Sequence, residues 1–89
     1  MTTKFFHPKQ HLGYSTKLSI AENVSRGHRC ALERHEKEPY LVTAHELEAL
    51  ANVSEHSAPK SSRHFRAAAD YAFTLHDTRE KKQRITLIP

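Results

Sequence analysis

Apolar residues recur at helical spacing in three stretches of the chain, most regularly between residues 63 and 81. Apolar residues follow Phe65 at 3, 4, 7 and 10 positions, and His76 follows at 11 positions. This spacing places them along one side of a helix. Ser61 or Ser62 stands where an N-terminal cap is expected. The pattern therefore predicts a helix from about Arg63 to Lys81, with Phe65 and its row of alanines packed inward.

An earlier helix is predicted from about Ile20 to Lys37. Ser19 and Glu22 have the spacing of a capping box, in which each side chain bonds to a backbone amide of the other residue. Pro39 is expected to end this helix, because a proline disfavours the helical conformation of the residue before it. Gly27 lies in its middle and lowers its stability by up to about 1 kcal/mol.

The strongest local signal for a helix start lies between these two stretches. Thr43 and Glu46 form a second capping-box pattern, and Val42 can pack on Leu47 as a hydrophobic staple. We therefore expect a helix that begins at Thr43, ends at residue 54 or 56, and is separated from the next helix by Pro59.

The two ends of the chain do not follow a helical pattern. Residues 1–14 have no helical periodicity and predict an extended arm, whereas the β-branched, apolar residues 85–89 indicate a short strand. The predicted fold is mostly α: a small three-helix domain with an extended N-terminal arm (1–14), a helical core (15–82) and a short β-like C-terminal tail (83–89). The residues expected to fill most of the core are Leu47, Leu50, Phe65, Phe73 and Leu75.

Length and composition restrict the chain to one small domain. Its 89 residues are 37% hydrophobic and 27% charged, with no Trp, so the core is thin and a partner or a homodimer is expected to complete it. A lone cysteine, Cys30, indicates a reducing compartment, and we expect a cytoplasmic protein. No apolar run reaches signal-peptide or membrane-span length, so no membrane association is predicted.

The sequence predicts no catalytic, metal or cofactor site. His28, Cys30 and His35 are close in sequence, but on a helix Cys30 points away from His28, so they do not converge on an ion. His45 and Glu46 begin a metalloprotease-like pattern that lacks its second histidine. With two isolated glycines there is no phosphate-binding loop, and we expect that the protein is not an enzyme.

Charge is divided unevenly along the chain. The net charge is +4, and Lys and Arg exceed Asp and Glu in residues 1–30 and 60–89, whereas residues 31–59 hold six Glu against two basic residues. Basic residues flank both ends of the predicted third helix, where the first-turn amides also favour a phosphate. The predicted nucleic-acid-binding residues are Lys60, Ser61, Ser62, Arg63 and Arg66 at its start and Lys81, Lys82 and Arg84 at its end.

These features lead to two hypotheses. The first is a small basic DNA- or RNA-associated protein, regulatory or accessory, of a size typical of phage and mobile-element proteins. The second is an adaptor or an inhibitor of a host enzyme or complex, which binds protein through the acidic segment 47–56 or the apolar tail. Residues 46–54 resemble the first helix and turn of a helix-turn-helix, but Pro59 would then lie inside the recognition helix.

Overall fold

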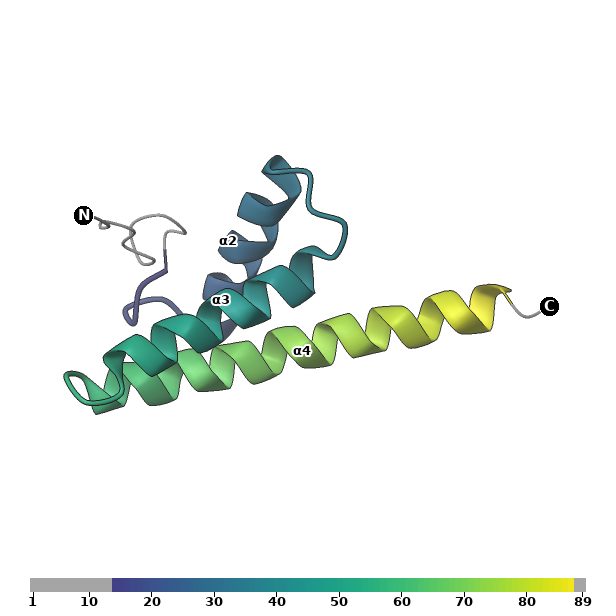
Figure 1. Ribbon diagram of the computed structural model, residues 1–89. Coiled ribbons are helices and arrows are strands. Elements are labelled where there is room, and N and C mark those ends of the chain that lie inside the picture. Colours follow the sequence, from purple (N-terminus) through teal and green to yellow (C-terminus); the bar gives the residue numbers. More distant parts are fainter. Residues whose placement is uncertain (1–13, 88–89) are drawn as a thin grey trace.

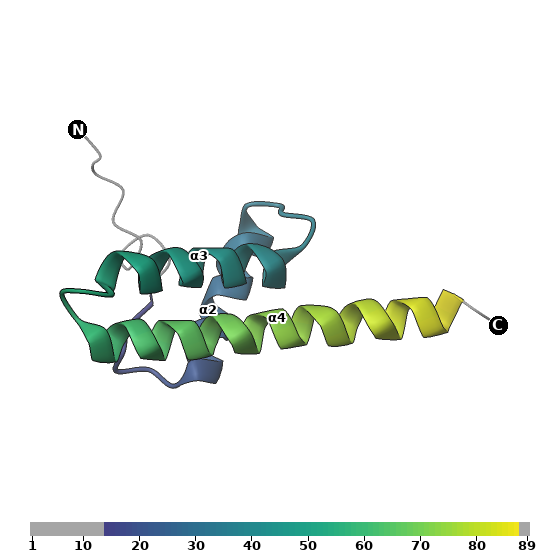
Figure 2. The same cartoon turned by 60° about the horizontal axis from the view of Figure 1, so that its bottom comes forward.

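The structure, a computed structural model, describes residues 14–87, with side chains for residues 14–82, and consists of three helices in this range (Figure 1). They are α2 (Ile20–Glu33), α3 (Pro39–Ser54) and α4 (Pro59–Leu87). Helices α3 and α4 lie side by side as an antiparallel hairpin, and α2 packs against both (Figures 1 and 2). The prediction of a mostly α, three-helix domain is confirmed.

The core lies where the three helices meet. Phe65, Leu47 and Val24 are its largest fully buried apolar side chains. Small residues surround them, which allows α3 and α4 to approach closely; these are Ala44, Ala51, Ala68, Ala69 and Ala72. The predicted inward packing of Phe65 and its alanine row is therefore confirmed, whereas Phe73 and Leu75 are only partly buried at the edge of the core.

The start of α2 agrees with the sequence. The Ser19 Oγ accepts a hydrogen bond from the Glu22 amide, and the Ser19 amide donates to the Glu22 carboxylate, at 3.1 and 3.0 Å. These bonds lower the pKa of the Glu22 carboxyl. The first capping box is thus confirmed.

The end of α2 comes four residues before the predicted one. His35 has a φ of 63°, its amide donates to Leu32 O, and the amide of Glu36 donates to Ala31 O. This is a Schellman motif, which uses the last carbonyls of a helix and turns the chain away. Helix α2 therefore ends through its own backbone geometry, well ahead of Pro39.

Replacement of His35 by glycine is expected to stabilise the protein by about 1 kcal/mol, because glycine adopts a positive φ without a Cβ clash. For a domain of this size, the change raises the midpoint of thermal unfolding by about 4–8 °C, measurable by circular dichroism. His56→Gly is the matched control. His56 is exposed in the turn after α3 and has no positive φ, so glycine there lowers the midpoint through backbone entropy.

The predicted start of α3 at Thr43 is wrong. Pro39 occupies the first helical position, where its fixed φ suits a helix and no amide bond is lost. The helix therefore begins one turn earlier, and the Thr43 hydroxyl donates to Pro39 O at 2.7 Å within the helix. Glu46, the supposed capping partner, binds Arg34 of the α2 cap instead.

Helix α4 is longer than predicted at both ends. It begins at Pro59, and Ser62 is not its cap, because the buried Ser62 hydroxyl donates to Ala51 O of α3 at 2.8 Å. Residues 85–87 are helical, so the predicted strand does not form there. Once a helix is established, each further residue adds a backbone bond, which outweighs a weak β preference. The N-terminal arm up to residue 13 and residues 88–89 lie outside the described residues.

The helix-turn-helix resemblance is not realised. In that motif the second helix crosses the first at about 90–120°, whereas α3 and α4 run antiparallel and in contact along α3 (Figure 2). Pro59 stands at the first position of α4 rather than inside it. The turn of residues 55–58 therefore closes a helical hairpin.

Candidate functional site

The first turn of α4 presents three of the predicted binding residues. Lys60 and Arg63 are exposed and Ser61 is half-buried. The amide of Ser62 makes the first backbone bond into the turn, to Ala58 O. The amides of Lys60 and Ser61 precede it and belong to the set that a helix leaves without an internal acceptor. Two cationic side chains thus stand beside the positive end of a long helix.

Two other predicted residues, Ser62 in this turn and Arg66 in the next, are engaged by the protein itself. Ser62 is 4% exposed and bound to α3, so its hydroxyl is not available to a ligand. One Arg66 guanidinium nitrogen donates to Asn52 Oδ1 at 3.1 Å and to Glu55 Oε1 at 3.2 Å. The predicted cluster of five is therefore reduced to Lys60, Ser61 and Arg63.

The far end of α4 forms a separate basic cluster. Lys81 and Lys82 are exposed, whereas the side chain of Arg84 lies outside the described side chains. Arg63 and Lys81 are 18 residues apart, which is five full turns, so they point to the same side of α4 about 27 Å apart. Asp70 and Asp77 are exposed on this side between them. The eight predicted residues therefore do not form one continuous patch.

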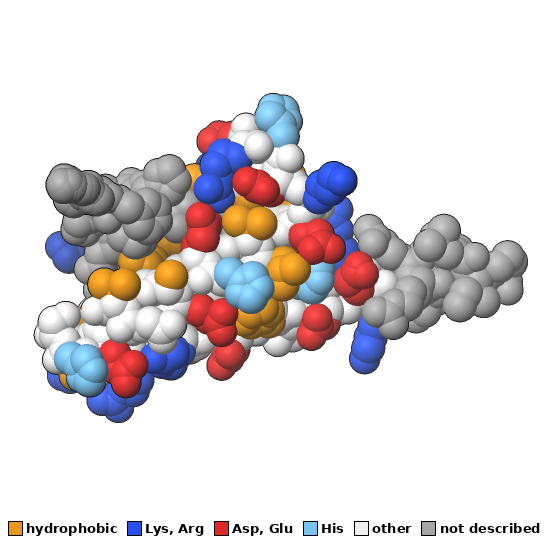
Figure 3. All heavy atoms as spheres, viewed as in Figure 1, with side chains coloured by type: hydrophobic (Ala, Val, Ile, Leu, Met, Phe, Trp, Pro, Cys, Tyr) orange, Lys and Arg blue, Asp and Glu red, His pale blue; other side chains and the backbone are white. Residues whose placement is uncertain are grey.

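Acidic residues of α3 neutralise part of the basic surface. Glu46 accepts two bonds from Arg34 at 3.2 and 3.3 Å, and Glu55 accepts one from Arg66. Figure 3 shows basic and acidic side chains interspersed on the face viewed, with basic side chains also gathered at the turn that joins α3 to α4. Two acidic residues of α3 are thus paired with arginines of the same chain, one from the α2 cap and one from α4.

The space between α2 and α4 holds an aromatic pocket of about 230 Å³ that the sequence did not indicate. The His28 ring stacks on Tyr40 with centroids 4.1 Å apart, and its buried Nδ1 has no hydrogen-bond partner in the described part of the chain. Burial, and secondarily the charge of Arg79, lower the pKa of His28. The lining also includes Tyr71 and Leu75 of α4.

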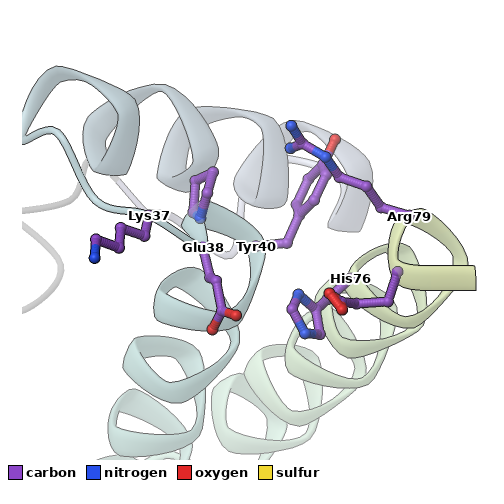
Figure 4. A pocket seen from close by; sticks show the side chains of 7 residues that line it. Lys37, Glu38, Tyr40, His76 and Arg79 are labelled. Atoms are coloured by element: carbon purple, nitrogen blue, oxygen red, sulfur yellow. The ribbon is translucent and has the colours of Figure 1, made fainter. Parts of the chain in front are cut away.

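A second hollow, of about 240 Å³, lies between the start of α3 and the middle of α4. Figure 4 shows the Glu38 and His76 side chains directed into the same space. One donor atom each from Glu38, His76 and Glu80 lies within 4.8 Å of the other two. Local spacing does not indicate this group, because 38 positions separate Glu38 from His76. Among the described residues, His28, Cys30 and His35 form no comparable group.

No known protein family, curated protein or solved structure matches the chain. Within the described residues, no helix combines the length and the apolar character needed to cross a bilayer.

Proposed function

We propose that this chain is a small non-enzymatic protein that associates with nucleic acid, in a regulatory or accessory role, through phosphate contacts of α4. The observation that carries the proposal is the exposure of Lys60 and Arg63 beside the first-turn amides of a 29-residue helix. Backbone amides at a helix start and adjacent cationic side chains are the groups that bind phosphate. Ser61 adds a half-buried hydroxyl donor at the same turn.

The distribution of charge along α4 favours contact at its two ends. Asp70 and Asp77 place negative charge between Arg63 and Lys81, where a duplex lying flat on the helix would bring its phosphates. A flexible single strand can reach the first turn and the Lys81 end while it bends away from the acidic interval. RNA or single-stranded DNA is therefore the better candidate than duplex DNA.

The decisive experiment measures binding of a labelled single-stranded oligonucleotide by fluorescence anisotropy at several salt concentrations. For three to four phosphates neutralised, the logarithm of the affinity falls by about 2–3 per tenfold increase in salt. Lys60→Ala/Arg63→Ala removes two contacts, so we expect weaker binding and a slope smaller by about 1.4.

Arg29→Ala/Lys37→Ala is the charge-matched control, because both side chains are exposed and belong to the second half of α2 and its link to α3, which lie away from the turn between α3 and α4 (Figure 1). This variant is expected to keep most of the affinity and the original slope. An equal loss in the two variants, or an affinity that does not respond to salt, would contradict a phosphate site at Lys60 and Arg63.

A protein partner is the second candidate function, and one observation favours it. Val53 is 75% exposed at the end of the acidic helix α3, and Leu32 of α2 is 50% exposed. Of the other apolar residues of segment 47–56, Leu47, Leu50 and Ala51 are buried and Ala49 is exposed but offers a single methyl group, so Val53 is the largest apolar contact available there. Purification of the protein from cells, followed by nuclease treatment, distinguishes the two functions. A polypeptide that stays bound in stoichiometric amount after the nuclease, and that does not bind the Val53→Glu variant, supports a protein partner.

A further inference from the structure

We propose that Glu38, His76 and Glu80 bind one divalent transition-metal ion, with Zn²⁺ as the best-suited candidate. Glu38 is the N-cap residue of α3, and His76 and Glu80 lie one turn apart on α4. The group combines one imidazole with two carboxylates, a donor set that Zn²⁺ accepts and that differs from the all-oxygen sites typical of Ca²⁺ and Mg²⁺.

The geometry of the three donors is close to that of a bound ion. Their ligand atoms lie within 4.8 Å of one another. Ligands around zinc at bond lengths of about 2.0–2.2 Å are separated by about 3.3–3.6 Å in a tetrahedral site. Rotation of side chains that are exposed or half-buried is enough to close this difference, because none of the three is held by a hydrogen bond or ion pair within the described residues.

The surroundings of the group supply a second reason for a cation. Ligand atoms of Glu38 and Glu80 lie within 4.8 Å of each other, and none of the described side chains forms an ion pair with either carboxylate, although Lys37 and Arg79 line the same hollow. In Figure 4 the Lys37 side chain points away from Glu38, and Arg79 reaches toward Tyr40. Two carboxylates at this separation repel each other, and an ion bound between them would replace the repulsion by attraction. The hollow of about 240 Å³ also leaves room for water as a fourth ligand.

A bound ion would connect two elements that are distant in sequence. Glu38 belongs to the link between α2 and α3, and His76 lies in the half of α4 that leads to its C-terminal end. Metal binding therefore ties that link to α4 and stabilises the folded state by mass action. This site lies about 24 Å along α4 from Lys60, so it is separate from the proposed phosphate contact.

The test is a titration of the purified full chain with ZnSO₄ by isothermal calorimetry, after treatment with a chelator. We expect a site that binds one ion per chain, and a rise of about 10–20 °C in the unfolding midpoint when free zinc is 100 times the dissociation constant. His76→Ala and Glu80→Gln should each weaken this site by about tenfold or more. Glu38→Gln changes an exposed residue without altering its size, so it tests the site with little risk to the fold.

His45→Ala is the matched control for a chain with eight histidines. His45 is also beside a glutamate, since its Nδ1 lies 3.1 Å from Glu48 Oε1, but no third donor from the described part of the chain joins this pair. Its replacement should leave the one-ion site unchanged. The proposal fails if His76→Ala and Glu38→Gln bind zinc as the unsubstituted chain does, or if His45→Ala weakens binding equally. The titration contains no nucleic acid, so its outcome is independent of the proposed function.

Discussion

Gly27→Ala is expected to destabilise the protein by about 2–3 kcal/mol, although alanine is the better helix former. At an exposed helical position the same change would stabilise by about 1 kcal/mol. Gly27 is buried in the middle of α2 and lies against Tyr14 and Thr43. The expected loss is thus opposite in sign to the intrinsic helix propensity.

The reason is the absence of space for a methyl group. A Cβ at Gly27 would lie 2.5 Å from Thr43 Cγ2, 2.8 Å from Tyr14 Cζ and closer still to Tyr14 Oη. Thr43 is fully buried and held by its bond to Pro39 O, and Tyr14 is 3% exposed. One of these side chains must leave its place. Overpacking costs typically about 1–3 kcal/mol and occasionally more, and with two buried side chains blocking the methyl group we expect about 3–4 kcal/mol, against about 1 kcal/mol gained in helix propensity.

Urea and thermal unfolding followed by circular dichroism measure this effect. In a Tyr14→Ala/Thr43→Ser background the blocking atoms are absent, so Gly27→Ala should become stabilising there. Ser25→Ala, at an exposed position of the same helix, controls for propensity alone. A stabilising Gly27→Ala in the unsubstituted chain would mean that Tyr14 is not packed on α2.

The fold was predictable where a local pattern agreed with the packing. Ser19 and Glu22 cap α2 as their spacing indicates. Thr43 and Glu46 have the same spacing, yet Thr43 lies inside α3 because Pro39 already starts that helix one turn earlier. A capping pattern identifies residues that suit a helix start, and the neighbouring chain decides which start is used.

The candidate phosphate site was predictable only in part. Lys60 and Arg63 are exposed beside the first turn of α4, as expected. Arg66 was expected to join them, but it binds Glu55 across the helical hairpin, and that contact depends on how α3 returns onto α4. The group of Glu38, His76 and Glu80 likewise depends on helix packing rather than on local spacing. Contacts between helices therefore account for what the sequence could not indicate.

Asn23→Ala is expected to destabilise the protein by about 3 kcal/mol and to lower its unfolding midpoint by more than 10 °C. Asn23 is a fully buried polar residue of α2. Its Oδ1 accepts from the Ser15 amide at 3.0 Å, and its Nδ2 donates to Ser15 O at 2.9 Å. The Nδ2 also lies 2.8 Å from His64 Nε2 of α4, which accepts when the imidazole is neutral with its proton on Nδ1. One side chain thus ties the segment before α2 and the start of α4 to α2.

Asn52→Ala is the matched control, because Asn52 begins the same Asn-Val-Ser triplet but is exposed, and among the described residues its side chain bonds only to Arg66. Loss of this exposed bond costs less than about 1 kcal/mol, since water replaces the amide. At Asn23, alanine leaves partly buried groups of Ser15 and His64 without partners and a space where the amide stood, and each unsatisfied group costs about 1–3 kcal/mol. Urea unfolding of the two variants side by side measures the difference. Equal and small losses would show that water reaches Ser15 and His64, and that Asn23 does not hold the three segments together.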